Sequence, residues 1–302
     1  SIFVKEFISN NSQNKYTAKA YSKLINVHET LKQRDLVLDY LSKLSEFCNS
    51  GSIENSCKEE FRKISLDISK KWWDIWLKNK NHAEFSKLTE AAFNILLSYD
   101  DVSNPDSTSR FAYAELLFQL GKFEKASENY EMVSKDSKFD PAKKHDALYG
   151  SIFSLDKIAE KNPQAEILTT DRLQNLTLRY VAEYPQGEYA EPLKFKLGFI
   201  AYQKQNSEEA IKYLLPIAKQ SKNKQLKVKS EDIILDIYNL NKDYKAIQKF
   251  ATDSLANTSS TERKNNLSQI KEEAHFSQIQ IDTASADANK KIETLLAFSN
   301  EH

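Results

Sequence analysis

Glycine and proline are scarce in this chain, with five and six residues respectively among 302. Alternating runs of Val, Ile and Thr, the usual pattern of half-buried strands, are nearly absent too. Apolar residues at helical spacing are therefore the main periodic signal. The sequence predicts an all-α architecture.

The chain also has no excess of positive or negative charge, because 43 Lys and Arg residues balance 43 Asp and Glu residues. Binding to a phosphate backbone needs a basic excess, so nucleic acid is not an expected partner. No uncharged apolar run approaches the roughly 20 residues of a membrane-spanning helix. The sequence thus predicts no direct membrane span.

Catalytic and cofactor motifs are absent as well. The five histidines lie on different segments without metal-ligand spacing, and five glycines leave little material for a phosphate-binding loop. Adjacent pairs such as Glu208 and Glu209 point to different parts of a helix surface and cannot share a proton. We therefore predict no catalytic residue, no cofactor and no metal site.

What is present is a repeated spacing of small and large apolar residues. Ala114 lies 12 positions before Ala126, and Gly198 lies 12 positions before Ala210. Large apolar residues follow the second small residue by four and seven places in both stretches, which is one face of an α-helix. Each stretch therefore predicts a hairpin of two antiparallel helices with small residues at their contact.

The first stretch resembles the tetratricopeptide repeat family. That pattern has a small residue in the first helix, Gly before an aromatic residue at the turn, then Ala and an aromatic residue in the second helix. The matching residues are Ala114, Gly121, Phe123, Ala126 and Tyr130. The second stretch has Asn206 and Ser207 at the turn instead. The resemblance implies a tetratricopeptide-like superhelix, an antiparallel helical-hairpin solenoid; an unrelated hairpin solenoid or an irregular helical bundle is the alternative.

A third, degraded unit is expected between these two. Gly150 follows Ala114 by 36 residues but precedes Gly198 by 48, so about 14 residues exceed the family period of about 34. The insertion is placed near residues 162–170. Pro185 and Gly187 then end one helix before the next begins, and this Tyr-Pro-x-Gly-x-Tyr-Ala linker resembles those of bacterial envelope tetratricopeptide proteins, such as outer-membrane lipoproteins.

The chain is thereby divided into three segments. Residues 1–107 are expected to form irregular helical hairpins, including one with its turn at Gln33–Asp35. Residues 108–220 carry the tetratricopeptide-like repeats, with Asp106 or Ser107 as the first helix cap. Residues 221–302 are expected to form further hairpins or a helical cap.

The resemblance also implies a binding groove, because side chains flanking the small residue of each first helix face the concave surface of this repeat type. An aromatic groove would hold an apolar or amphipathic peptide. The alternative is that these aromatics pack against the next hairpin. The expected groove residues are Phe111, Glu115, Phe118, Gln119, Phe195, Phe199, Tyr202 and Gln203.

The three tryptophans of the chain lie close together, at positions 72, 73 and 76. Trp72 and Trp76 are four residues apart and share a helix face, which favours a core role. Trp73 points elsewhere and could be an exposed anchor for a partner.

Two cysteines bear on the compartment. Cys48 and Cys57 flank one short interhelical loop that could bring them together, and a disulfide there would indicate an oxidising compartment such as a periplasm. Together with the linker resemblance, this gives the expected location as the bacterial periplasm or an outer-membrane-associated position. Two free thiols in a cytoplasmic protein are the alternative. The chain begins at Ser1 without a signal-peptide pattern, so we interpret it as a mature or excised fragment.

The sequence therefore predicts a non-enzymatic scaffold that binds a partner peptide or protein along a concave groove in a bacterial envelope. The alternative is a helical arm of a larger enzyme or of a secretion or assembly machine, whose catalytic part lies outside this chain.

Overall fold

The computed structural model describes residues 2–11, 14, 16–49, 55–79, 83–98, 106–161, 163–284 and 287–301, with the side chains of 55, 163–170 and 299–301 left undescribed. Within these ranges every regular element is a helix, which confirms the all-α class. The helices are α1 (Ile2–Asn10), α2 (Thr17–Thr30), α3 (Arg34–Asn49), α4 (Asn55–Lys78), α5 (Ala83–Leu97), α6 (Ser107–Gln119), α7 (Phe123–Lys135), α8 (Pro141–Lys161), α9 (Pro163–Glu183), α10 (Ala190–Gln203), α11 (Ser207–Gln220), α12 (Lys224–Leu240), α13 (Tyr244–Ala256), α14 (Thr261–Asp282) and α15 (Ala288–Glu301).

The chain forms two compact units, Ser1–Leu176 and Thr177–His302. Each has its own apolar core, with Phe61, Trp72 and Phe93 among the fully buried side chains of the first and Ile234, Phe250 and Leu267 in the core of the second. The boundary falls inside α9, within the segment 108–220 that the sequence groups together. The inserted residues 163–170 belong to α9, whereas residue 162 lies outside the described residues.

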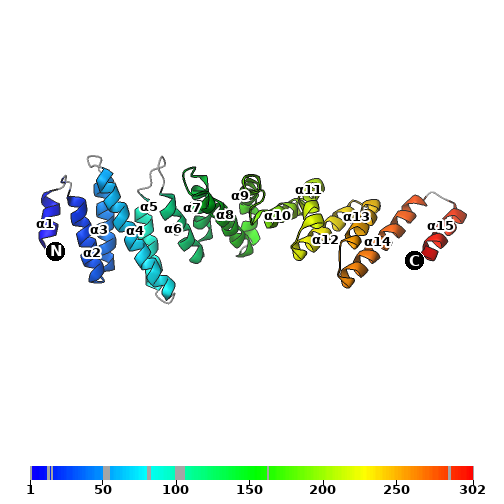
Figure 1. The fold of residues 1–302 in the computed structure, drawn as a ribbon, viewed down its shortest axis with the longest axis horizontal. Coiled ribbons are helices and arrows are strands. Elements are labelled where there is room, and N and C mark those ends of the chain that lie inside the picture. Colours follow the sequence, from blue (N-terminus) through cyan, green and yellow to red (C-terminus); the bar gives the residue numbers. More distant parts are fainter. Residues whose placement is uncertain are drawn as a thin grey trace. The chain divides into compact units, whose positions relative to one another are not determined.

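Within each unit a helix packs mainly on its neighbours in the chain (Figure 1). Helices two apart in the chain also meet, as α2 meets α4 and α3 meets α5 in the first unit, and α10 meets α12 in the second. Contacts of this kind arise when helical hairpins stack on one another. The arrangement agrees with the expected hairpin solenoid.

Four interhelical turns in the described residues share one backbone geometry. Gly121 and the residues Lys32, Gln205 and Lys242 all have positive φ, between 55° and 73°. The next residue in each turn donates its N–H to the carbonyl five residues earlier at 2.9 Å, for example Lys122 to Leu117. This is the hydrogen bond of a Schellman helix end. It joins the hairpins α2–α3, α6–α7, α10–α11 and α12–α13.

The α2–α3 turn lies at Leu31–Gln33, and α3 begins at Arg34, so the expected turn at Gln33–Asp35 is displaced. Side-chain caps begin several other helices. The Asp106 carboxylate accepts the Ser109 N–H at 3.0 Å, which selects Asp106 over Ser107 as the cap of α6. Caps of this kind satisfy N–H groups that have no partner inside the helix.

Small residues lie where helices of one hairpin approach closely. Ala114, Ala126 and Ala210 are fully buried. A Cβ added to Gly198 on α10 would lie 2.6 Å from Leu214 Cγ on α11, closer than two carbon atoms can pack. Glycine at this position therefore sets the separation of the two helices.

Candidate functional site

The expected groove residues of α6 are largely engaged within the first unit. The Phe111 ring meets the Tyr130 ring edge to face at 5.6 Å, and Phe118 stacks on Phe153 of α8 at 5.5 Å. The Tyr130 hydroxyl donates a hydrogen bond to the Glu115 carboxylate. Gln119 is exposed. Phe111 thus packs on α7 of its own hairpin, whereas Phe118 packs on α8 of the next one.

The expected residues of α10 are more accessible. Phe195 and Phe199 stack with nearly parallel rings at 6.4 Å, and Tyr202 follows at 6.3 Å from Phe199. Phe199 is 40% exposed, Phe195 and Tyr202 are half-buried, and Gln203 is exposed. The three rings form one aromatic row along a single face of α10. This row is the accessible part of the expected site.

A carboxylate on the neighbouring hairpin extends the aromatic row. The Tyr202 hydroxyl donates to Asp236 Oδ2 of α12 at 2.5 Å. This hydrogen bond raises the pKa of the Tyr202 phenol above its ordinary value, because the nearby carboxylate favours the protonated hydroxyl. Tyr202 thus connects α10 to α12 and stays an uncharged donor at neutral pH.

Beyond Asp236 the surface is hollowed. A cavity of about 430 Å³ lies among α12, α13 and α14. Its apolar walls include Leu235, Ile247, Ile270 and Ala274. Polar residues on α12 and α14 complete its lining, namely Asp232, Asp236, Asn239, Glu273 and Ser277. We call the surface made by these five residues together with Phe195, Phe199 and Tyr202 the α10–α14 face.

Sequence reasoning missed the α12 and α14 part of this face. A signal was present, because Asp232, Asp236 and Asn239 are spaced by four and three residues and so share one side of a helix. The two repeat-like stretches, residues 114–133 and 198–217, end before α12 begins at Lys224, so the resemblance implies no groove residue on α12 or α14.

A buried ion pair lies beside the α10–α14 face. Arg263 Nε and Nη2 of α14 donate to Glu231 Oε2 of α12 at 3.2 and 2.9 Å, while Nη1 lies 2.7 Å from Asp232 Oδ1. Burial raises the pKa of Glu231 above its ordinary value, and the hydrogen bond from Arg263 opposes that shift without cancelling it. This group ties α12 to α14.

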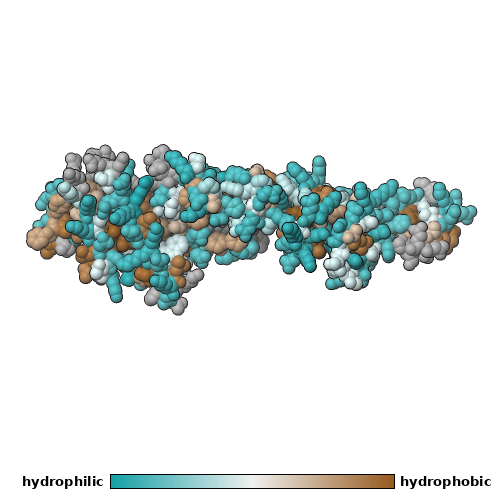
Figure 2. Space-filling view, in the orientation of Figure 1, coloured by the Kyte–Doolittle hydropathy of each residue, from teal (hydrophilic) through white to brown (hydrophobic). Residues whose placement is uncertain are grey.

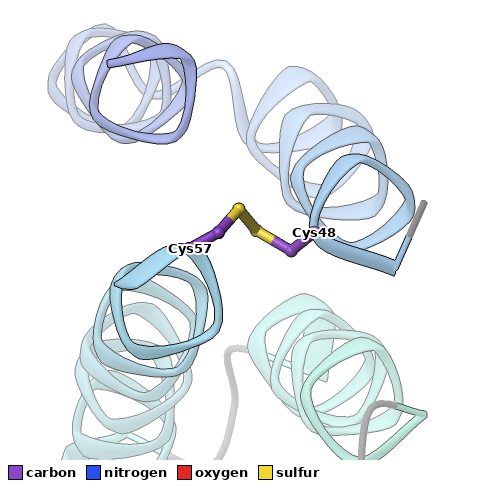
Figure 3. Close-up of a disulfide and its surroundings, with 2 residues drawn as sticks. All are labelled: Cys48 and Cys57. Atoms are coloured by element: carbon purple, nitrogen blue, oxygen red, sulfur yellow. A yellow bond between two sulfur atoms is a disulfide. The ribbon is translucent and has the colours of Figure 1, made fainter. Parts of the chain in front are cut away.

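The cysteines lie at the ends of two consecutive helices. Cys48 in the last turn of α3 and Cys57 in the first turn of α4 point toward each other and form a disulfide, with their Cα atoms 5.5 Å apart (Figure 3). Both residues are buried. The bond links α3 to α4 across residues 50–54, which lie outside the described residues.

The tryptophans of α4 belong to the core of the first unit. Trp72 is fully buried, and its indole Nε1 donates to Glu29 Oε2 at 3.1 Å. Trp73 is half-buried, with its ring edge to face against Phe93 at 6.0 Å. Trp73 therefore packs along the core and is less exposed than a free anchor would be.

No three His, Cys, Asp or Glu side chains come together as a metal site in the part of the chain that the structure describes. Across the same ranges, no helix combines the length and apolarity needed to cross a membrane. His82 and His302 lie outside the described residues.

No protein-family model matches this chain, and no curated protein does so either.

Proposed function

We propose that the protein is a non-enzymatic scaffold that holds a partner peptide or protein on the α10–α14 face. The aromatic row of α10 carries this proposal, because Phe199 stays 40% exposed while its ring stacks on Phe195 and lies next to Tyr202. Rigid aromatic rings presented together at a surface are the side chains that contribute most to protein interfaces. The resemblance of Ala114–Tyr130 to tetratricopeptide repeats supports the same role.

The disulfide supports a location for this scaffold. Disulfides persist in oxidising compartments and are rare in cytosolic proteins. With the Cys48–Cys57 bond and the linker Tyr184–Ala190, which resembles those of envelope proteins, we propose a bacterial periplasm, in association with the outer membrane.

The test is a selection of phage-displayed random 12-residue peptides on the immobilised protein. Peptides enriched on the wild type should bind the variant Phe199→Ala/Tyr202→Ala roughly 30-fold more weakly, the effect of losing about 2 kcal/mol at an interface hot spot. The melting temperature should fall by only a few degrees, because these rings are only partly buried and the lost Tyr202–Asp236 hydrogen bond contributes about 1 kcal/mol.

Met132→Ala is the matched control, since Met132 is an exposed apolar residue on α7 in the other unit. It should leave peptide binding unchanged. A large loss of thermal stability in the double variant would show that the rings serve the core and would remove the proposal. Peptides that bind both proteins equally would remove it as well.

A further inference from the structure

The cavity beside the aromatic row has the form of a side-chain pocket. Helices α12 and α14 flank it, and α13 contributes Tyr244 and Ile247. Its volume of about 430 Å³ lies within the range of small-ligand sites, roughly 300–1,000 Å³, and so leaves room for one side chain. Leu235, Ile270 and Ala274 give it apolar walls. An apolar side chain of a bound segment could be buried there.

The polar residues of the cavity carry charge of one sign. Asp232, Asp236 and Glu273 supply three carboxylates, and none of the described residues that line the cavity is basic. Arg263 lies next to it, but its guanidinium is shared between Asp232 and the buried Glu231. Arg263 is thus engaged by Asp232 and Glu231, and the Asp236 and Glu273 carboxylates give the cavity negative charge within a chain of zero net charge.

The aromatic row adds a second feature that favours cations. Asp236 is joined to Tyr202 by a hydrogen bond, so the carboxylates and the rings form one continuous surface. The faces of Phe and Tyr rings attract guanidinium and ammonium groups. Hydrophilic side chains cover most of the surface seen over α11–α14 in Figure 2, with apolar residues between them.

We propose that the occupant of the α10–α14 face is a cationic, partly apolar peptide segment. Its Lys or Arg side chains lie beside Asp236, Glu273 and the aromatic row, and an apolar residue enters the cavity among α12, α13 and α14. Opposite charge on the two surfaces favours encounter and excludes acidic segments. The proposal rests on the proposed function and names the chemistry of its partner.

The composition of the selected peptides tests this proposal. Peptides enriched on the wild type should be rich in Lys and Arg with interspersed apolar residues, and their affinity should fall as salt rises. The variant Asp232→Asn/Asp236→Asn/Glu273→Gln keeps the side-chain shapes, and the new amide oxygen at position 236 can still accept the Tyr202 hydrogen bond. We expect this variant to bind these peptides at least roughly tenfold more weakly, with little remaining salt dependence.

The control removes the same number of charges elsewhere. Glu124→Gln/Glu208→Gln/Asp253→Asn alters exposed carboxylates on α7, α11 and α13, and it should bind as the wild type does. Peptides that need Phe199 and Tyr202 but show no basic enrichment would overturn this inference and leave the scaffold intact. Peptides that ignore both sets of substitutions would overturn the scaffold and the inference together.

Discussion

Single residues in the turns show how much backbone strain the hairpins accept. Lys32, Gln205 and Lys242 hold the left-handed conformation that Gly121 adopts in the equivalent turn. That conformation costs a residue with a Cβ about 1–2 kcal/mol. The tight turns are therefore stabilised by their backbone hydrogen bonds and by the helices that pack around them.

Lys242→Gly should raise the free energy of unfolding. Relief of the left-handed strain exceeds the extra freedom that glycine gains in the unfolded chain, about 0.5–1 kcal/mol, so we expect a net gain of about 0.5–1 kcal/mol. Urea midpoints measure it. Lys204→Gly is the matched control, because Lys204 has a φ of −80° beside the left-handed Gln205; it should destabilise. Equal effects of both substitutions would contradict the strain argument.

Among the helices, α12 and α14 are joined by an ion pair that is largely buried. The side chains of Arg263 and Glu231 are 12% and 3% exposed. Arg263→Leu leaves the Glu231 carboxylate buried without its partner, a loss of about 3–5 kcal/mol. Arg263→Leu/Glu231→Leu should recover most of that loss, because no charge then remains buried. Chemical denaturation of the two variants distinguishes these outcomes, and equal destabilisation of both would contradict the ion-pair argument.

The same pair makes part of the stability depend on pH. Because burial raises the pKa of Glu231, the folded protein holds this proton more tightly than the unfolded chain does. Its contribution is present below the ordinary Glu pKa and declines as pH rises through the folded value. Glu231→Gln should remove this decline from the pH profile of the urea midpoint.

Much of the helical architecture follows from local sequence signals. The small-residue spacing predicts the hairpins α6–α7 and α10–α11, and the close approach of Gly198 to Leu214 agrees with it. Local signals place the cap of α6 at Asp106 or Ser107, and the hydrogen bond that Asp106 accepts from the Ser109 N–H distinguishes the two.

Other features depend on contacts that a single helix does not reveal. The sequence does not reveal the exact position of the α2–α3 turn, because Lys32, which holds the turn conformation, is not a glycine. The contact of Phe118 with Phe153 joins two hairpins, and helical spacing alone cannot tell such a ring from an exposed one. The same holds for Asp236, whose role follows from its hydrogen bond to Tyr202 on another hairpin.

At the scale of the whole molecule, the two units have separate cores. We therefore expect that a substitution that destabilises one unit leaves the stability of the other unchanged. The disulfide lies in the first unit. Cys48→Ser/Cys57→Ser should lower the stability of that unit by about 2–3 kcal/mol, the value expected for closing a short loop. Amide hydrogen exchange should accelerate in α2–α5 and stay unchanged in α10–α13, since repeat proteins transmit stability mainly between neighbouring elements.

Two control measurements accompany this prediction. Wild-type protein unfolded without reductant should show no reactive thiol, and reductant should not alter exchange in the cysteine-free variant. Faster exchange throughout α10–α13 would mean that the two units unfold as one.

The four matching turns also bear on how such a chain can diverge. A hydrogen bond between backbone groups, such as that from the Asp243 N–H to the Tyr238 carbonyl, does not depend on which side chains the turn carries. Lysine or glutamine can therefore replace glycine at such a turn, because the packing of the helices offsets the backbone strain of about 1–2 kcal/mol. A lineage of hairpins built in this way can keep its architecture while the residues that would reveal its ancestry disappear one at a time.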